Sequence, residues 1–162
     1  MTGEKTANFR EVMRRFATGV TVVTTSIDGK PKGLTANAFA SVSAEPPMVL
    51  ICVNRQSRSH PLIARAGHFC VNILALDQQT IAQRFASHDP VDPFDTIAYE
   101  IATTGSPVLA GTLGFLDCKL EEEHTAGTHT IFIGTVVDCG ATGGAPLGYF
   151  NAGYRDFGCQ IT

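Results

Sequence analysis

The residues best suited to ligand binding are small polar side chains that directly precede an apolar segment. The stretch GLTANAFASVSAEPPMVLICVN occupies residues 33–54, and RQSRS follows it. Small side chains let a flat ligand approach the backbone, whose N–H and C=O groups can contact a polar ring edge. The hydroxyls of Ser57 and Ser59, with Arg55 or Arg58, would suit a phosphate. From the pattern alone, an ordinary loop followed by a capped helix is the alternative interpretation.

Two histidines flank a turn in the last third of the chain. His124 and His129 follow three consecutive glutamates, but their spacing matches no common metal motif, so we predict no metal site. His129 begins a predicted strand directly after Gly127 and Thr128, where its ring would project over a pocket. A purely structural histidine is the alternative.

Several other kinds of chemistry are disfavoured by the spacing of the residues. The glycine-rich segment GATGGAP, residues 140–146, follows a predicted strand without opening a helix, and it matches neither nucleotide-binding glycine motif. A dinucleotide would therefore not be held by a Rossmann turn. No serine lies in a G-x-S-x-G context, and no cysteine lies at a helix start that would lower its pKa. Hydrolase chemistry is accordingly not expected.

Length and composition indicate one β-rich domain over residues 1–162. The chain is 44% hydrophobic and 17% charged, with 16 glycines and no tryptophan, which is typical of a globular protein with many turns. The net charge of −3 and scattered basic residues make nucleic acid an unexpected partner. Without a signal-peptide pattern or a membrane-length apolar run, we expect no membrane association and a cytoplasmic location.

The five cysteines are predicted to be buried, reduced thiols, because they are odd in number and widely spaced. They are Cys52, Cys70, Cys118, Cys139 and Cys159.

The elements that must position these residues follow from periodicity and turn signals. Apolar residues at helical spacing predict a helix over residues 8–17 that lies on a sheet. Asp28-Gly29 predicts a tight hairpin between strands 19–27 and 30–38, and a turn near Ala126-Gly127 joins strands 114–123 and 128–138. Further strands are predicted at 48–54 and 68–74, with one more short strand in 139–155. Helices are predicted in 55–67, with Ser57 or Ser59 as cap, and in 77–86, capped by Asp77. Residues 87–100 are predicted to be a surface loop.

Six or seven strands with helices inserted between some of them favour a closed or nearly closed antiparallel β-barrel with peripheral helices. The fold class is therefore mainly β.

Several motifs in the same order resemble the flavin reductase family, which has the FMN-binding split-barrel fold with Greek-key connections. They are FATGVTVVTTSIDGKPKGLTANAFASVSAEPPMVLICVNRQSRSHPLI, FCVNILA, QRFAS, GTHTIFIGTVVD and PLGYF. The resemblance runs from about Phe9 to Tyr154. It implies a small reductase component of a two-component flavin-dependent monooxygenase.

The resemblance also implies roles for individual residues. The segment lining the isoalloxazine ring comprises Thr35, Ala36, Asn37 and Ala38, where Ala38 replaces a more usual serine. The segment along the pyrimidine edge comprises Cys52, Val53 and Asn54.

Further roles implied by the resemblance concern the phosphate and the nicotinamide. Ser57 and Ser59 match the phosphate contacts, and Arg84 and Phe85 match residues near the ribityl or phosphate side. His129 is the implied catalytic residue, through nicotinamide binding. Its neighbour Thr128 replaces a more usual aspartate. Tyr154 belongs to a tyrosine-containing ending that the family shares.

The implied reaction is hydride transfer from NADH or NADPH to FMN or FAD, with the reduced flavin passing to a separate monooxygenase. Such proteins are typically homodimers. Two alternatives are a split-barrel flavoprotein that reduces a metal centre, such as cobalamin or a ferric complex, and a non-enzymatic flavin-binding barrel.

Overall fold

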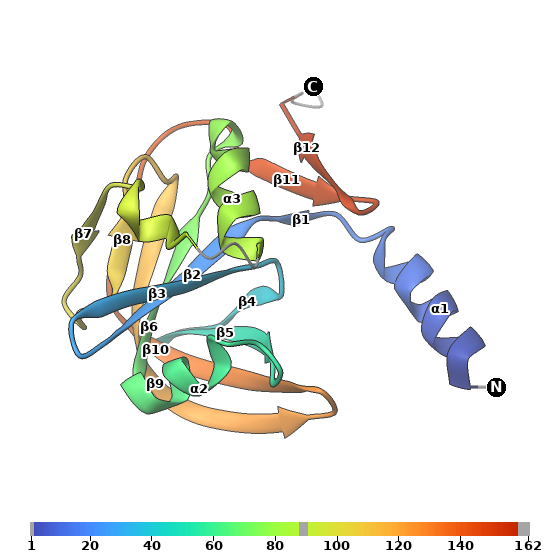
Figure 1. Cartoon of the computed structure of the whole chain (residues 1–162), viewed down its shortest axis with the longest axis horizontal. Coiled ribbons are helices and arrows are strands. Elements are labelled where there is room, and N and C mark those ends of the chain that lie inside the picture. The colour runs from blue at the N-terminus through green and yellow to red at the C-terminus, as the bar shows by residue number, and fades with distance from the viewer. Residues whose placement is uncertain (1, 88–90, 159–162) are drawn as a thin grey trace.

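A seven-stranded antiparallel sheet, in the order β3-β2-β6-β9-β10-β5-β4, forms the body of the protein (Figure 1). The structure is a computed structural model that describes residues 2–87 and 91–158. The strands of this sheet are β2 (Thr21–Ile27), β3 (Lys30–Ala36), β4 (Phe39–Ala44), β5 (Pro47–Asn54), β6 (His68–Ile73), β9 (Gly114–Ala126) and β10 (His129–Ala141).

Smaller elements surround the main sheet. Two minor sheets contain β1 (Thr18–Gly19), β11 (Leu147–Phe150) and β12 (Gly153–Asp156), and β7 (Tyr99–Ile101) with β8 (Pro107–Leu109). The helices are α1 (Thr2–Met13), α2 (His60–Ala66) and α3 (Gln79–Ala86), with 3₁₀ turns η1 (Leu76–Gln78) and η2 (Pro93–Asp95).

The hairpin predicted at Asp28-Gly29 is confirmed. Both residues have positive φ, 52° and 73°, as a two-residue turn between twisted strands requires. The turn between β9 and β10 is also confirmed, with Gly127 at φ 58°. β9 and β10 extend three residues past their predicted ends at 123 and 138, because the two strands pair from His129 opposite Ala126 to Ala141 opposite Gly114.

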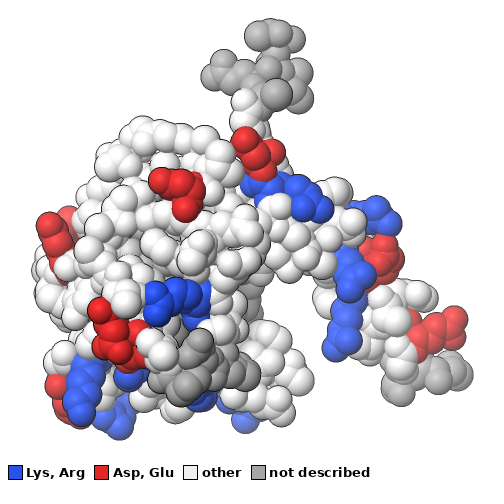
Figure 2. Space-filling view, turned by 45° about the horizontal axis from the view of Figure 1, so that its top comes forward, with Lys and Arg blue, Asp and Glu red and all other residues white. Residues whose placement is uncertain are grey.

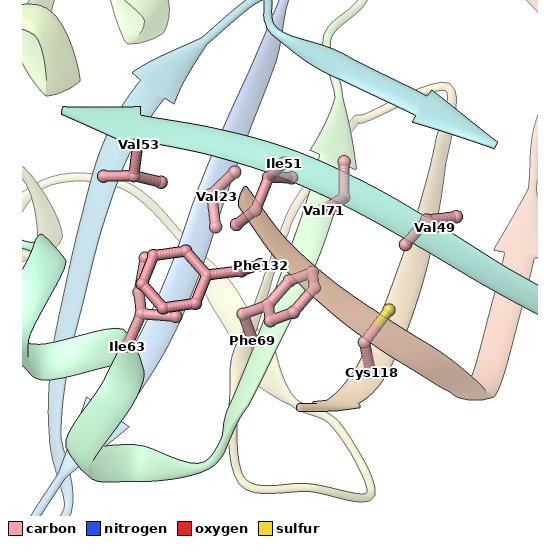
Figure 3. Close-up of a cluster of buried hydrophobic side chains, with 9 residues drawn as sticks. All are labelled: Val23, Val49, Ile51, Val53, Ile63, Phe69, Val71, Cys118 and Phe132. Carbon is pink, nitrogen blue, oxygen red and sulfur yellow. The ribbon is translucent and has the colours of Figure 1, made fainter. Parts of the chain in front are cut away.

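The main sheet curls around one core. Val23 on β2 and Ile51 on β5 belong to the same buried cluster, although three strands separate β2 from β5 in the sheet. Figure 3 shows side chains from β2, β5, β6, β9, β10 and α2 pointing toward one another, with the rings of Phe69 and Phe132 at the centre. The chain leaves β5 through α2, which packs against β2 and β6, and then enters β6, which β9 and β10 separate from β5 in the sheet. The expected mainly antiparallel β-fold with peripheral helices is therefore confirmed.

A second buried cluster lies where α3 covers the sheet. It joins the α3 residues Ala82 and Phe85 to Val22 of β2, with Val20, Leu74, Leu109 and Leu147. This cluster fixes α3 against one face of the curled sheet, beside β3.

The N-terminal helix of the structure differs from the predicted helix in extent and position. It spans Thr2–Met13 rather than 8–17, and it projects away from the body instead of lying on a sheet (Figure 1). Its apolar side chains are exposed, with Phe9 at 65% and Val12 at 67%. An amphipathic face requires an apolar partner, and within the described part of this single chain none reaches it.

Some other local predictions are wrong. Strand β4 was not predicted, because its small residues resemble a loop, yet it pairs with β5. The last predicted strand is the hairpin β11–β12, and residues 91–100 contain η2 and part of the pair β7–β8. Residues 88–90 of that predicted loop lie outside the described residues.

The predicted helix caps also differ. Asp77 lies within η1, and α3 begins only at Gln79. The side chain of Gln78, rather than of Asp77, makes the hydrogen bonds at this point. Its Oε1 accepts the Ala75 N–H at 3.0 Å, and its Nε2 donates to the Ala110 carbonyl at 2.8 Å. Ser59 occupies the N-cap position of α2, but its side chain makes no capping hydrogen bond.

The cysteines differ in burial. Cys70 and Cys118 are buried, and burial raises the pKa of the Cys118 thiol to about 12. Cys52 is half-buried, and Cys139 is exposed, which contradicts the prediction for that residue. All four are free thiols, and Cys159 lies outside the described residues. No helix in the described ranges is long and apolar enough to cross a membrane.

A polar cluster links β6 and β9 to the turn before β8. His68 Nδ1 lies 2.7 Å from Ser106 Oγ, and the buried Asp117 carboxylate accepts from Thr104 N–H at 2.8 Å and Thr104 Oγ1 at 2.6 Å. Desolvation lowers the pKa of His68, although the charge of Asp117 raises it in part. The imidazole is therefore held in its neutral form.

This cluster predicts a loss of stability in mild acid. Because the folded pKa of His68 lies below the unfolded value of about 6.5, the unfolded state binds the proton more readily. The free energy of unfolding should therefore fall as pH decreases through about 6.5 toward the folded pKa. Urea titrations at pH 7.5 and 5.5 would measure this fall, which His68→Gln should reduce and His124→Gln, at an exposed position, should not. An equal fall in all three proteins would contradict this role of His68.

Candidate active site

Two free strand edges face each other across a split in the curled sheet. Strand β3 is the terminal strand of the sheet and pairs only with β2 among the described strands. Strand β4 pairs with β5 only as far as Ile51, and one further hydrogen bond joins Cys52 N–H to the Ala38 carbonyl at 2.9 Å. Beyond that point, Val53 and Asn54 have no β4 partner. Backbone polar groups on such edges remain available to a ligand.

A cavity of about 1120 Å³ occupies this split. Its walls come from β3, the end of β5, the segment before α2, the end of α3, and the segment at η2. The lining residues are Lys32, Gly33, Leu34, Thr35, Ala36, Asn37, Ala38, Cys52, Val53, Asn54, Gln56, Ser57, Arg58, Ser59, Leu62, Arg84, Phe85, Ala86, Ser87, Val91, Asp92, Pro93, Phe94 and His129. Of the residues that the sequence analysis proposed for the site, only Tyr154 and the alternative phosphate residue Arg55 are missing from this set.

One end of the cavity offers backbone and small side chains. Ala36, Asn37 and Ala38 leave β3 there, opposite Cys52 and Asn54. Val53 lies in the same wall, but its side chain belongs to the core and is 1% exposed, so it presents backbone rather than side chain. Burial raises the pKa of the Cys52 thiol, which therefore remains protonated and is a poor nucleophile. This end fits a planar ligand whose polar edge contacts the backbone.

His129 stands at the same end of the cavity. It begins β10 and pairs in register with Asn54 of β5. Its Nδ1 lies 2.9 Å from Thr128 Oγ1, and the Thr128 carbonyl accepts the Arg55 N–H at 3.0 Å. The threonine that replaces the more usual aspartate therefore still orients the imidazole. Nε2 remains the ring nitrogen free to face a ligand.

The second histidine of the predicted turn does not join the site. His124 Nε2 lies 2.7 Å from Glu122 Oε2 on the exposed part of β9. Among the described residues, no group of three or more histidine, cysteine or acidic side chains could hold a metal ion.

The middle of the cavity carries hydroxyl and cationic groups. Ser59 Oγ donates to the Gly33 carbonyl at 3.1 Å, so it joins the start of α2 to β3. Ser57 Oγ accepts the Ser59 N–H at 3.3 Å, and its own proton remains available to an anion. Of the two arginines proposed for a phosphate, Arg58 lines the cavity and Arg55 does not.

Helix α3 supplies a further cation and an aromatic wall. Thr35 Oγ1 donates to the Ala82 carbonyl at 2.6 Å, which ties α3 to β3. A Cβ on Gly33 would lie only 2.8 Å from the Phe85 ring, so glycine is needed for this close approach. Arg84 enters the cavity wall beside them and hydrogen-bonds to Thr96 Oγ1.

Tyr154 lies in a separate, smaller pocket. This pocket of about 200 Å³ shares Thr35, Ala36, Asn37 and Ala86 with the main cavity, and Val20 and Tyr149 complete it. The Tyr154 ring meets the Tyr149 ring edge-on, with centroids 5.6 Å apart. Burial and Tyr149 both raise the pKa of Tyr154. The structure therefore places Tyr154 next to the predicted site rather than within its main cavity.

Sequence reasoning missed the wall formed at η2. Asp92, Pro93 and Phe94 line the cavity, and Lys32 Nζ reaches Asp92 Oδ2 at 3.2 Å. No motif marks these residues, because their place depends on how the chain returns over β3 after α3. The charged residues that line the cavity are three cations, Lys32, Arg58 and Arg84, and one acid, Asp92. The cavity wall is therefore predominantly cationic.

Comparison with known proteins identifies a family match over residues 13–158, to the flavin reductase like domain. The chain is 47% identical to a protein of Rhodococcus jostii called the reductase subunit HsaB of a flavin-dependent monooxygenase, over 79% of this chain and 65% of that protein. It is 38% identical to "FMN reductase (NADH) SmoA" of Agrobacterium fabrum, over 98% of this chain and 90% of that protein.

A solved structure has the same fold. It is the NADH:FAD oxidoreductase SgcE6 of Streptomyces globisporus, with a TM-score of 0.92 and 35% identity over 98% of this chain and 96% of that chain. SgcE6 has also been solved in complex with NAD and FAD fragments.

Proposed function

The chain belongs to the flavin reductase-like domain family, and on that premise we propose that it transfers a hydride from NADH to a flavin and supplies the reduced flavin to a separate monooxygenase. The observation that carries the proposal is the cavity between the free edges of β3 and β5. Relatives called flavin reductases, or reductase components of monooxygenases, favour this function over a non-enzymatic flavin-binding barrel.

The residues present fit a flavin. The free backbone edges and the small side chains at Ala36 and Ala38 suit a flat ring with a polar edge. Ser57 and Arg58 in the middle of the cavity offer an O–H donor and a cation for the phosphate, and Arg84 lies in the same wall. A bound flavin supplies the hydride-accepting chemistry.

The chain's own residues bind and orient the two rings and stabilise the negative charge on the flavin. The Cys52 N–H is already bonded to the Ala38 carbonyl. The backbone of Thr35–Asn37 and the end of β5 beyond Cys52 line the cavity where free N–H groups would stabilise negative charge on a flat ring. His129, held at Nδ1 by Thr128, presents Nε2 to the open face of that ring, where it would orient the nicotinamide. Holding two rings at reacting distance is the main requirement, so no side-chain acid is needed.

The proposal predicts flavin-dependent oxidation of NADH. Purified protein should oxidise NADH when FMN or FAD is added, and under anaerobic conditions reduced flavin should accumulate. The measurements are the loss of NADH absorbance and the bleaching of the flavin, each with NADH and with NADPH. Absence of turnover with both flavins and both nucleotides would refute the proposed function.

His129→Ala should weaken the nicotinamide interaction selectively. Losing one oriented hydrogen bond should raise the KM for NADH about five- to tenfold. The dissociation constant for flavin, measured by fluorescence, should change little. His124→Ala, on the same hairpin but outside the cavity, is the matched control. Unchanged NADH kinetics in His129→Ala would remove this residue from the site.

We also propose that the protein is a homodimer in which a second copy covers α1. The apolar residues Phe9, Val12, Met13 and Phe16 are exposed on and just after this helix. Figure 2 shows α1 standing apart from the body, with acidic and basic side chains along it. Such an unpaired apolar face costs solubility unless another surface covers it.

Sedimentation equilibrium should therefore give a mass near twice the 17.2 kDa of one chain. The double variant Phe9→Ser/Val12→Ser should shift the population toward monomer, because it removes the apolar face. Lys5→Ser, a charged residue on the same helix, should not. A wild-type protein that sediments as a monomer would exclude the dimer.

Location and domain organisation complete the proposal. We propose a cytoplasmic location, supported by the free thiols at Cys52, Cys70, Cys118 and Cys139. We propose a single domain over residues 1–162, supported by the family match over residues 13–158.

A further inference from the structure

The chain between β5 and α2 is a succession of tight turns. The Asn54 carbonyl accepts the Ser57 N–H at 2.9 Å, and Asn54 Oδ1 accepts the Gln56 N–H at 2.9 Å. The Ser57 carbonyl accepts the N–H of His60, the first residue of α2, at 3.2 Å. We call residues 54–60 the turn segment. Because these bonds are local, they shape the turn segment but do not fix its position relative to other strands.

Two further hydrogen bonds fasten the turn segment to the start of β10. Near its beginning, the Arg55 N–H donates to the Thr128 carbonyl at 3.0 Å. At its end, His60 Nε2 lies 2.7 Å from Thr130 Oγ1. The two partners, Thr128 and Thr130, are the residues on either side of His129. The turn segment and the start of β10 are therefore joined by bonds that bracket the histidine of the site.

Packing restricts the bond between His60 and Thr130. Thr130 is buried, with 4% of its surface exposed. The His60 ring is half-buried and lies against the Phe132 ring, with centroids 5.2 Å apart, and Phe132 belongs to the main core. A buried hydroxyl that loses its partner costs free energy. The bond therefore holds the start of α2 at a fixed distance from β10.

Neither His60 nor Thr130 lines the cavity, so an effect of this bond on a ligand must pass through other residues. Ser57 and Arg58, which fit the flavin phosphate, lie in the turn segment just before His60. His129, which would orient the nicotinamide, directly precedes Thr130. One hydrogen bond thus connects the parts of the wall that face two different ligands.

We propose that His60 is a positioning residue, which through Thr130 sets the distance between the turn segment and His129. This inference rests on the proposed function, because it takes the flavin phosphate to lie at Ser57 and the nicotinamide at His129. Without the bond, both parts of the wall must be ordered when the ligands bind, which weakens binding of each. Once both ligands are bound, that order is restored, so kcat should change less than the two affinities.

Binding and kinetic measurements on two variants test this role. His60→Phe keeps an aromatic ring and Thr130→Val keeps the branched shape, but each removes one side of the hydrogen bond. Fluorescence titration gives the dissociation constants of FMN and FAD, and steady-state kinetics gives the KM for NADH. In each variant the flavin constants and the KM should rise together, about three- to tenfold, as expected for one lost hydrogen bond. A rise in only one of the two quantities would overturn the positioning role.

A double variant and a conservative variant isolate the bond itself. If the two residues act through each other, His60→Phe/Thr130→Val should bind both ligands no more weakly than either single variant. Thr130→Ser, which keeps the hydroxyl, should bind both ligands as the wild type does. Additive losses in the double variant, or equal losses in Thr130→Ser and Thr130→Val, would contradict a role for this hydrogen bond.

His68→Phe is the matched control for a merely structural effect. His68 Nδ1 also lies 2.7 Å from a hydroxyl, that of Ser106, and neither residue lines the cavity. Urea titration should show a lower free energy of unfolding, while the flavin constants and the KM stay within about twofold of the wild type. Losses of binding equal to those of His60→Phe would overturn the inference. A wild type without NADH turnover would instead refute the proposed function.

Discussion

Two strand edges that stay unpaired inside a folded sheet are the constraint on which the rest of this structure depends. A free edge exposes backbone donors and acceptors, which proteins normally pair or cover. Here the outer edge of β3 and the end of β5 face a shared cavity instead. The curled sheet can leave this split because its stability comes from elsewhere. The core around Phe69 and Phe132 joins β2 to β5 through the continuous strands β6, β9 and β10.

Residues around the split make contacts that keep it open and rigid. Gly33 lets the Phe85 ring approach the backbone of β3, and Thr35 fastens β3 to α3. Ser59, which resembles a helix cap in the sequence, uses its hydroxyl proton to hold the start of α2 against Gly33. These contacts pre-organise both walls, so a ligand does not have to order them on binding. The same logic applies to His129, whose orientation comes from Thr128 and the hairpin turn.

Much of the fold was predictable because its signals are local. Asp28-Gly29 favours positive φ at two successive residues, and that choice alone determines the first hairpin. The apolar segment of β5 and the alternation in β9 likewise identify strands. The failures have non-local causes. Strand β4 has a loop-like composition and is a strand only through its pairing with β5. Helix α1 has an apolar face whose partner lies beyond the described single chain.

For the site, the sequence by itself determined which residue types were available: small residues at 35–38, hydroxyls at 57 and 59, and a histidine at the start of β10. The family resemblance grouped them, and the tertiary structure decided which share a cavity. It selected Arg58 over Arg55, placed Tyr154 in an adjoining pocket, and added Lys32, Asp92 and Phe94. These outcomes depend on the curl of the sheet and on the path of the chain after α3. Both are set by packing between segments far apart in sequence, which no local pattern records.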